Sequence, residues 1–248
     1  MHIVIPDDYQ HAVRSLDCFA QLSGHKVSLY HDVQKDPRVL AQRFADADAL
    51  VLTRERCVID EALLAQLPRL KLISQTGRVG PHLDLDACSR HGVAVMEGRG
   101  SPIAAAELTW ALMLNARRQL RTAIDGLYAG HWQVNLGERL CGQTLGIWGY
   151  GKIGQRMARY ARAFDMEVLV WGRAASLELA RAEGHRVATS KAAFFAEADV
   201  VTLHLRLNDA TRGTVTASDL ALMKPSATLV NIARGGIVDD AALAKALA

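Results

Sequence analysis

The chain has 248 residues, of which 50% are hydrophobic and 22% are charged, and its formal net charge is +3. This composition is typical of a folded globular protein with one or two domains and excludes a disordered chain. The small excess of basic residues is scattered along the sequence, so it predicts neither a nucleic-acid-binding nor a membrane-binding surface.

The cysteines stand far apart, at Cys18, Cys57, Cys88 and Cys141. This spacing fits neither a zinc site nor a redox motif, so we expect reduced, mostly buried thiols and no metal. The N-terminal segment has no basic stretch before a long apolar run, and no stretch approaches about 18 uninterrupted apolar residues. We therefore expect a cytoplasmic protein without a membrane span.

Short apolar runs alternate with amphipathic stretches in the first part of the chain. The predicted strands are His2–Ile5, Lys26–Tyr30, Ala49–Thr53, Leu70–Gln75 and Val93–Glu97, and predicted helices include Pro37–Ala47 and Asp60–Leu67. Short apolar strands separated by helices are typical of a parallel sheet covered on both faces. This pattern predicts a doubly wound α/β domain over residues 1–98, with a boundary near Gly98–Pro102.

A long helical pattern, Ile103–Gln119, then interrupts the alternation. Its apolar content predicts a well-buried helix that ends at the basic residues Arg117, Arg118 and Arg121. We interpret these arginines as a solvated helix end rather than an anion site.

After a loop that contains Trp132, strands are predicted again at Thr144–Trp148, Glu167–Trp171, Val200–Leu205 and Thr228–Ile232. These predict a second doubly wound domain over residues 99–248. An alanine-rich helix without a cap is predicted for Asp240–Ala248.

The strongest motif is a glycine loop, Gly149-Tyr150-Gly151-Lys152-Ile153-Gly154, between a predicted strand and the helical run Gln155–Phe164. In this context the first glycine permits a tight turn, the second lets the backbone approach a pyrophosphate, and the third lets the helix pack on the strand. The N-terminus of the helix adds free N–H groups and partial positive charge. We therefore prefer dinucleotide binding to a purely structural turn.

The strand after this helix ends in Gly172-Arg173, where dinucleotide-binding domains that select NAD carry an acidic residue. Glycine leaves room for a 2′-phosphate and arginine can bind it, so we expect NADP to be preferred, with NAD possible. The alternative is that Arg173 stacks on adenine or faces water.

The second half of the chain resembles the D-2-hydroxyacid dehydrogenase family. The segments that carry the resemblance are Thr144–Gly154, Ala198–Leu205, Leu222–Pro225 and Leu229–Asp239, and earlier Ala105–Thr109 and Asp7–Gln10 match as well. The resemblance implies a flavodoxin-like substrate domain followed by a Rossmann-like cofactor domain. It also implies hydride transfer between NAD(P)H and a small-molecule 2-oxo or D-2-hydroxy acid whose identity the sequence does not give.

The resemblance implies a role for particular residues. Arg234 corresponds to the catalytic arginine that holds the carboxylate and carbonyl oxygen of the substrate, a task for which a planar, permanently charged guanidinium is suited. Gly77, Arg78 and Val79 correspond to a loop whose N–H groups grip the substrate carboxylate, and Arg78 hints at an additional anionic group on the substrate. The residues implied on the cofactor side are Lys152, Ile153, Ile232, Ala233, Thr109, His204 and Thr211. His204 is equally well interpreted as a core histidine with satisfied hydrogen bonds.

The family's acid–base histidine and its glutamate lie in segments that would follow Ala248. We therefore expect the 248-residue chain by itself to bind the dinucleotide but scarcely to turn over, with His82 and His204 as the first candidates for a substitute acid. A dinucleotide-sensing binding or regulatory protein without turnover is the alternative function. The resemblance further implies a homodimer built on Ile103–Gln119 and the loop with Trp132, with burial inside one subunit as the rival explanation.

Overall fold

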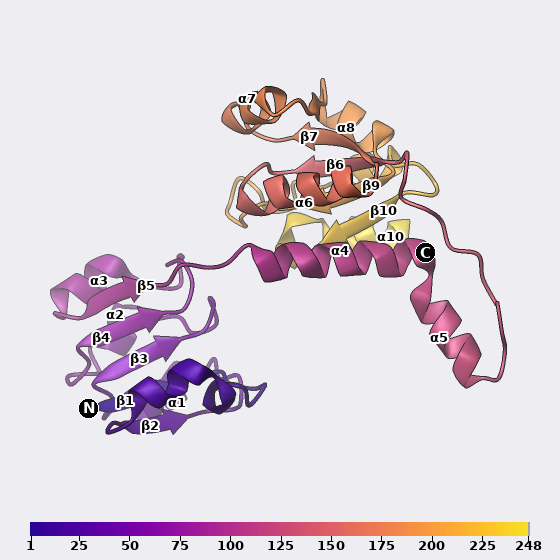
Figure 1. Cartoon of the computed structure of the whole chain (residues 1–248). Coiled ribbons are helices and arrows are strands. Elements are labelled where there is room, and N and C mark those ends of the chain that lie inside the picture. The colour runs from indigo at the N-terminus through magenta and orange to yellow at the C-terminus, as the bar shows by residue number, and fades with distance from the viewer. Residues whose placement is uncertain (248) are drawn as a thin grey trace. The chain divides into compact units, whose positions relative to one another are not determined.

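The computed structural model describes residues 1–247 as two compact units, Met1–Gly100 and a second unit that begins at Ser101 (Figure 1). This division falls two residues after the domain boundary expected from the sequence. Within residues 1–247, no helix combines the length and the apolar character needed to cross a bilayer.

The first unit contains a five-stranded parallel sheet in the order β2-β1-β3-β4-β5. Its strands are β1 (His2–Ile5), β2 (Lys26–Leu29), β3 (Ala49–Leu52), β4 (Leu72–Gln75) and β5 (Ala94–Glu97). Helices α1 (Pro37–Phe44), α2 (Glu61–Leu64) and α3 (Leu85–Arg90) pack on one face, and the 3-10 turns η1 (Val13–Ser15) and η2 (Asp17–Leu22) pack on the other.

Aspartate caps fix where the helices of this unit begin. The side chains of Asp36, Asp60 and Asp84 each accept a hydrogen bond from an N–H group in the first turn of α1, α2 and α3. Each cap satisfies a donor that would otherwise lack a partner and contributes about 1 kcal/mol. The caps therefore begin each helix directly after its loop and leave the carboxyl ends of the strands open.

The second unit contains a five-stranded parallel sheet in the order β10-β9-β6-β7-β8. Its strands are β6 (Thr144–Trp148), β7 (Glu167–Trp171), β8 (Arg186–Val187), β9 (Val200–Leu203) and β10 (Thr228–Asn231). One core contains side chains of α4 (Ile103–Arg118), α6 (Lys152–Ala163) and α7 (Ala174–Ala182). The core on the other face contains side chains of α8 (Lys191–Glu197), α9 (Ala217–Ala221), η3 (Gly235–Ile237) and α10 (Asp240–Ala246).

The chain direction reverses within the second sheet between β6 and β9. Strands β6, β7 and β8 run outward to one side, and the chain then returns to place β9 on the other side of β6. In open α/β sheets this switch point, at the carboxyl ends of the strands, is where ligands bind.

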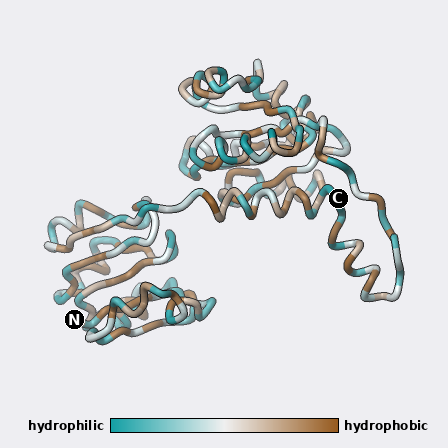
Figure 2. Tube along the Cα trace, in the orientation of Figure 1, coloured by the Kyte–Doolittle hydropathy of each residue, from teal (hydrophilic) through white to brown (hydrophobic). Residues whose placement is uncertain are grey.

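The α/β fold with parallel sheets is confirmed, and the predicted strands agree with the observed ones to within two residues at each end. Hydrophobic segments follow the strands in both units (Figure 2). Helices α3, α7, α8 and α9 and the two-residue strand β8 were not among the predicted elements.

The prediction of a well-buried helix over Ile103–Gln119 is wrong for one of its faces. Trp110 and Met113 are buried, but Ile103, Leu108 and Leu112 are exposed within this chain. Helix α4 ends at Arg118, because Gln119 takes a left-handed backbone conformation with φ 51°. A further helix, α5 (Leu120–Tyr128), follows and buries none of its residues (Figure 1).

The interpretation of the arginines as a solvated helix end is wrong for Arg117. This side chain is buried, donates to the carbonyl oxygen of Ser226 at 2.6 Å and forms an ion pair with Glu138. Arg117 therefore connects the end of α4 to the loop that precedes β10, through Ser226, and to the segment that precedes β6, through Glu138.

Two further expectations need correction. Cys57 and Cys88 are buried, but Cys18 and Cys141 are exposed, so only half of the thiols are buried. The last helix does have a cap, because the side chain of Asp239 accepts from the N–H of Ala242, and it ends at Ala246, while Ala248 lies outside the described residues.

Candidate functional site

The glycine loop connects β6 to α6 in the second unit. Gly149 has φ +102°, which strains any residue with a side chain, and a β-carbon there would lie 2.9 Å from the carbonyl oxygen of His204. Its N–H donates to the carbonyl oxygen of Trp171 at 2.9 Å. These contacts fix the loop against both strands that flank β6.

The N-terminus of α6 faces this loop without a cap of its own. Gly151 occupies the N-cap position, no side chain caps the helix, and its first turn carries no acidic residue. A β-carbon on Gly151 would meet no atom within 4 Å, whereas one on Gly154 would clash with the carbonyl oxygen of Gly149. The loop therefore presents free N–H groups beside open space, which is the arrangement that binds phosphates.

Tyr150, between the first two glycines, anchors the loop in a way that the sequence analysis missed. The side chain is buried, its hydroxyl donates to Glu183 at 2.5 Å, and its ring packs against His185. Burial and the neighbouring Glu183 carboxylate raise the pKa of Tyr150, so the phenol stays protonated and continues to donate.

Gly172 and Arg173 follow β7 at the same edge of the sheet. Arg173 is the N-cap residue of α7, and its side chain is exposed. No side chain caps α7 and no acidic residue lies in its first turn. A β-carbon on Gly172 would make only ordinary contacts, at 3.5 Å or more, so this glycine is not required by packing alone.

Arg234 follows β10, which is separated from β7 by the two strands β9 and β6. The side chain of Asn231 stabilises this turn. Its amide nitrogen donates to the carbonyl oxygen of Arg234 at 2.8 Å, and its Oδ1 accepts from the N–H of Ala233. Ile232 and Ala233 pack into the cores on opposite faces of the sheet. Asn231 was missed by the sequence analysis, although its place just before Arg234 could have indicated it.

The structure brings these segments together because parallel strands end at a common edge. Trp148 pairs with Leu203, and Leu203 pairs with Asn231, so the glycine loop, His204 and the Arg234 turn leave three neighbouring strands at one level. The carboxyl edge of the second sheet therefore gathers most of the cofactor-side residues expected from the sequence.

Three of the expected cofactor-side residues have side chains that are engaged or enclosed. Thr109 is fully buried and its hydroxyl donates to the carbonyl oxygen of Ala105, while the Thr211 hydroxyl donates to that of Arg206. Both ring nitrogens of His204 are buried without a hydrogen-bond partner among the described residues. Burial lowers the pKa of His204 to about 4, so it is neutral near pH 7. It is therefore not a core histidine with satisfied hydrogen bonds.

The loop after β4 carries the residues expected to bind a carboxylate. Arg78 is exposed, and among the described residues the N–H groups of Gly77 and Arg78 donate to no acceptor. The N–H of Val79, by contrast, donates to Oε2 of Glu97 at 3.1 Å. The third donor expected for a substrate is therefore occupied by a carboxylate of the protein.

His82, one of the two histidines considered as a substitute acid, is built into the first unit. It is buried, its Nε2 lies 3.1 Å from Oε1 of Gln75, and the amide of Gln75 donates to the carbonyl oxygen of Arg54. Arg54 has a left-handed backbone conformation with φ 61°, and the hydrogen bond from Gln75 to its carbonyl oxygen stabilises it. Burial lowers the pKa of His82.

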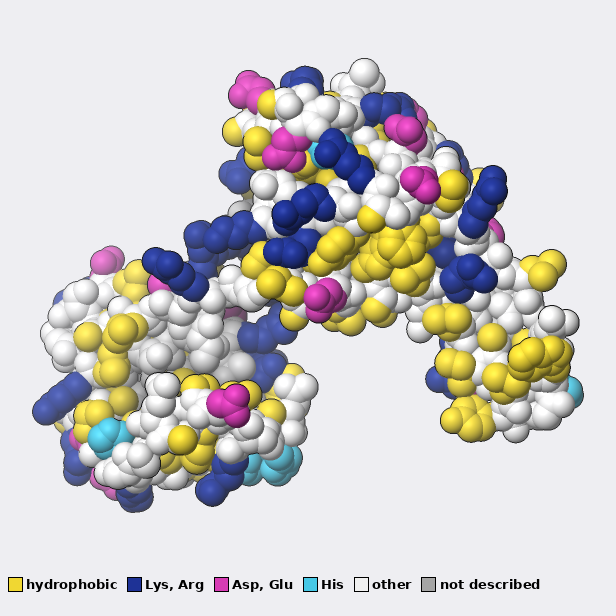
Figure 3. All heavy atoms as spheres, in the orientation of Figure 1, with side chains coloured by type: hydrophobic (Ala, Val, Ile, Leu, Met, Phe, Trp, Pro, Cys, Tyr) yellow, Lys and Arg dark blue, Asp and Glu magenta, His cyan; other side chains and the backbone are white. Residues whose placement is uncertain are grey.

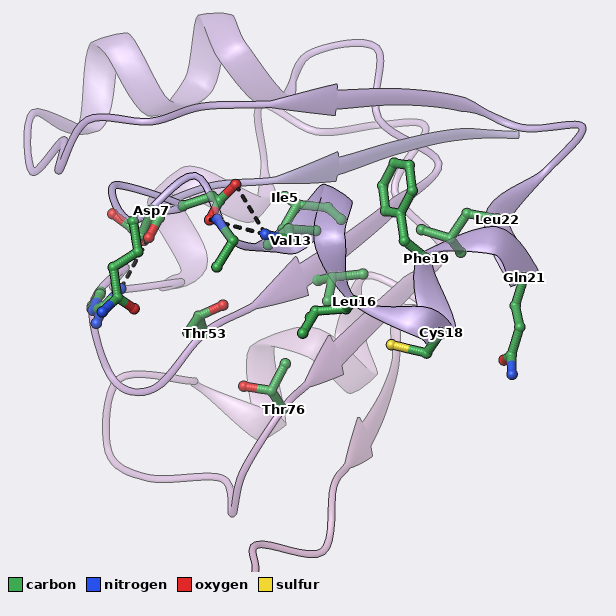
Figure 4. Close-up of a pocket in the computed structure, with 15 residues that line it drawn as sticks. Ile5, Asp7, Val13, Leu16, Cys18, Phe19, Gln21, Leu22, Thr53 and Thr76 are labelled. Carbon is green, nitrogen blue, oxygen red and sulfur yellow. Dashed lines mark hydrogen bonds between the residues drawn. The ribbon is translucent and has the colours of Figure 1, made fainter. Parts of the chain in front are cut away.

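A cavity of about 510 Å³ lies at the carboxyl end of the first sheet, under η1 and η2. Figure 4 shows Thr53 and Thr76 beside strand ends, with Leu16 and Phe19 among the apolar side chains that line the space. Asp7, in the loop after β1, has φ 65° and accepts from the thiol of Cys57. Strained loops of this kind cluster at binding sites.

Comparisons with known proteins agree with this picture. The family model described as D-isomer specific 2-hydroxyacid dehydrogenase, NAD binding domain, matches residues 110–248. A glyoxylate reductase of Aeropyrum pernix is 37% identical over 239 residues, and the match covers 89% of this chain and 70% of that protein. A D-3-phosphoglycerate dehydrogenase of Methanocaldococcus jannaschii is 34% identical over 211 residues, covering 84% of this chain but only 40% of the relative.

Solved structures show the same relationship. The crystal structure of a phosphoglycerate oxidoreductase from Vibrio cholerae matches with a TM-score of 0.93 and 52% identity. The match covers 100% of this chain and 80% of that one.

Proposed function

The chain belongs to the D-isomer specific 2-hydroxyacid dehydrogenase family, and on this premise we propose a role for each part of the two units. It is an oxidoreductase that transfers hydride between a nicotinamide dinucleotide and a 2-oxo or 2-hydroxy acid. In the proposal, the second unit binds the dinucleotide and supplies Arg234 to the acid, and the first unit supplies backbone donors to the acid.

The residues present fit a dinucleotide. The open space beside Gly151 and the uncapped N-terminus of α6 suit a pyrophosphate, and Lys152 and Ile153 stand in the first turn of that helix. Tyr150 keeps the loop in shape through its bond to Glu183. When bound, the cofactor supplies or accepts the hydride, and the protein holds and orients both reactants.

Arg234 binds the carboxylate and the carbonyl oxygen of the acid in this proposal. Its place at the carboxyl end of β10, on the same sheet edge as the glycine loop, is the observation that carries the assignment. The planar guanidinium matches a carboxylate, and its positive charge stabilises the negative charge that develops on the oxygen as hydride reaches carbon. Asn231 is its positioning residue, because it fixes the backbone on both sides of the turn.

Gly77 and Arg78 supply N–H donors to the carboxylate of the acid in the first unit. Their freedom from other acceptors among the described residues supports this role. The loop that carries them follows β4, so it lies at the carboxyl edge of its sheet, where open α/β sheets bind ligands.

The cofactor preference proposed is NADP. Support comes from Arg173, whose exposed side chain has no hydrogen-bond or ion-pair partner among residues 1–247, and from the uncapped N-terminus of α7 beside it. A 2′-phosphate would meet a guanidinium and a helix N-terminus there, and no acidic residue of the first turn would repel it.

A homodimer is also proposed. Helix α4, helix α5 and the following loop expose large apolar side chains, namely Ile103, Leu108, Leu112, Leu120, Ile124, Leu127, Tyr128, Trp132, Val134 and Leu136. Figure 3 shows hydrophobic side chains over α4 and over α5. Tyr128 is 89% exposed and Trp132 is 75% exposed, so burial inside one subunit does not account for them. Contiguous apolar surface of this kind is typical of subunit interfaces.

The experiment that tests the proposed function compares Arg234→Ala with Arg139→Ala, an exposed arginine of the same unit. In the full-length enzyme, which contains the family's acid–base histidine, loss of Arg234 removes both positioning and charge stabilisation, so kcat/KM for reduction of 2-oxo acids should fall by about 10²–10⁴-fold. NADPH binding, followed by fluorescence titration, should persist in both variants. Near-native turnover by full-length Arg234→Ala would refute the assignment, and dinucleotide binding by the full-length protein without turnover of any 2-oxo acid would favour a dinucleotide-sensing protein.

A further inference from the structure

The loop after β4 is held in place by the residue that follows β5. The N–H of Gly98 donates to the carbonyl oxygens of Gln75, at 2.8 Å, and Gly77, at 3.1 Å. A β-carbon on Gly98 would lie 2.7 Å from the carbonyl oxygen of Thr76, so the two backbones approach as closely as glycine allows. These backbone contacts help to order the loop.

Glu97 adds a contact that the order of the loop does not require. Its Oε2 accepts from the N–H of Val79 at 3.1 Å, while its side chain remains exposed. The neighbouring N–H groups of Gly77 and Arg78 donate to no acceptor within the described part of the chain. Of these three backbone N–H groups, only that of Val79 is bonded, and its acceptor is a carboxylate of the protein. A carboxylate is also the group by which the expected ligand would bind.

We propose that Glu97 lowers the affinity of the loop after β4 for the substrate by competing with the substrate carboxylate. The inference rests on the proposed function, in which this loop binds the carboxylate of a 2-oxo acid. An incoming carboxylate either displaces Glu97 from Val79 or binds beside it at the two remaining donors. In both cases the negative charge of Glu97 opposes binding, because two like charges a few ångströms apart repel in a partly hydrated site.

A purely structural role for Glu97 leads to the opposite expectation. If the contact with Val79 were needed to shape the loop, removing it would disorder the donors and weaken binding of the acid. Competition predicts tighter binding after the charge is removed. The sign of the change therefore distinguishes the two roles.

The test uses Glu97→Gln, which keeps an acceptor for Val79 without the charge, and Glu97→Ala, which removes both. Binding of oxamate, an unreactive analogue of a 2-oxo acid, is measured by calorimetry in the presence of NADPH, and KM for glyoxylate is measured alongside. We expect Kd and KM to fall by about three- to ten-fold in both variants, the size of a single charge contact near a hydrated surface.

Asp86→Asn is the matched control, because it removes one exposed negative charge from α3 of the same unit without touching the loop. It should leave the Kd of oxamate unchanged. Unchanged or weaker binding in both Glu97 variants, with an unchanged Tm, would overturn the inference and leave the proposed function standing. If the unsubstituted protein binds NADPH but no oxamate, the proposed function of the loop fails and the inference falls with it.

Discussion

Gly149 and Gly154 touch each other across the turn between β6 and α6. A β-carbon at position 154 would overlap the carbonyl oxygen of Gly149 and would also lie 3.1 Å from the side chain of Ile147. Helix α6 therefore approaches its strand as closely as backbone permits, and this contact sets where the helix N-terminus stands.

We predict that one alanine substitution in this loop lowers the stability of the second unit and that another lowers its affinity for NADPH. Gly154→Ala should destabilise the second unit by about 1–3 kcal/mol, because the helix must move away from the strand. Gly151→Ala meets no neighbouring atom, so it should leave stability unchanged, yet it should weaken NADPH binding because its methyl group fills the space beside the helix N-terminus.

Urea denaturation followed by tryptophan fluorescence checks this prediction, since all four tryptophans (Trp110, Trp132, Trp148 and Trp171) belong to the second unit. NADPH titration gives the affinities. Equal loss of stability in the two variants would show that the close approach of α6 to β6 does not depend on Gly154.

Arg173→Gln should weaken NADPH binding by about 10-fold or more and leave NADH binding unchanged, because a charge-assisted bond to the 2′-phosphate is lost. Arg181→Gln is the control, since it removes an exposed arginine from the other end of α7. Both cofactors are titrated by their own fluorescence. An equal effect on NADPH and NADH would mean that Arg173 does not contact the phosphate.

The buried His204 should make the second unit sensitive to acid. Burial lowers the pKa of His204 to about 4, whereas a histidine in the unfolded chain titrates near 6.5. The unfolded state therefore binds the proton first as pH falls, and stability should decrease between about pH 6.5 and pH 4, by about 3 kcal/mol in total. Above about pH 6.5 this contribution is fully present.

His204→Phe removes the titrating ring, so the free energy of unfolding should depend less on pH in this range. His25→Gln, at an exposed position of the first unit, is the control and should keep the slope of the unsubstituted protein. The measurement is urea denaturation at pH 7.5 and pH 5. An unaltered slope in His204→Phe would assign the acid sensitivity to other groups.

Replacing an exposed leucine of α4 or α5 by aspartate should dissociate the proposed dimer. Leu112→Asp and Leu127→Asp place a charge on the apolar surface, whereas Leu179→Asp, on α7, changes a leucine outside it. Sedimentation at micromolar concentration should give a monomer for the first two variants and a dimer for the third. A monomeric unsubstituted protein would refute the dimer.

The parts of the fold that could be predicted depend on local patterns. The strands alternate with helices along the sequence, and Gly154 packs against Gly149 only five residues away. The spacing from Gly149 to Gly154, between a strand and a helix, therefore predicts both the local structure and its ligand.

The parts that could not be predicted depend on contacts between distant residues. Arg117 reads as the charged end of a helix, but its carbonyl partner Ser226 lies 109 residues away. Glu97 reads as the polar end of a strand, and only the pairing of β4 with β5 brings it to Val79. No periodicity in the sequence contains this information.

The left-handed Gln119 has a consequence for how this protein can change over time. The chain turns away from α4 at this residue to form α5. It returns to the end of α4, where the amide of Asn135 lies 3.4 Å from the carbonyl oxygen of Arg118 and the N–H of Glu138 donates to the carbonyl oxygen of Arg117. The two ends of the segment 119–137 therefore lie next to each other, so this segment forms a closed loop that contains α5. The entropic cost of closing a loop changes little with the loop's length. The segment 119–137 can therefore vary in length and sequence while the sheet keeps its packing. Assembly can thus evolve separately from the chemistry at the strand ends.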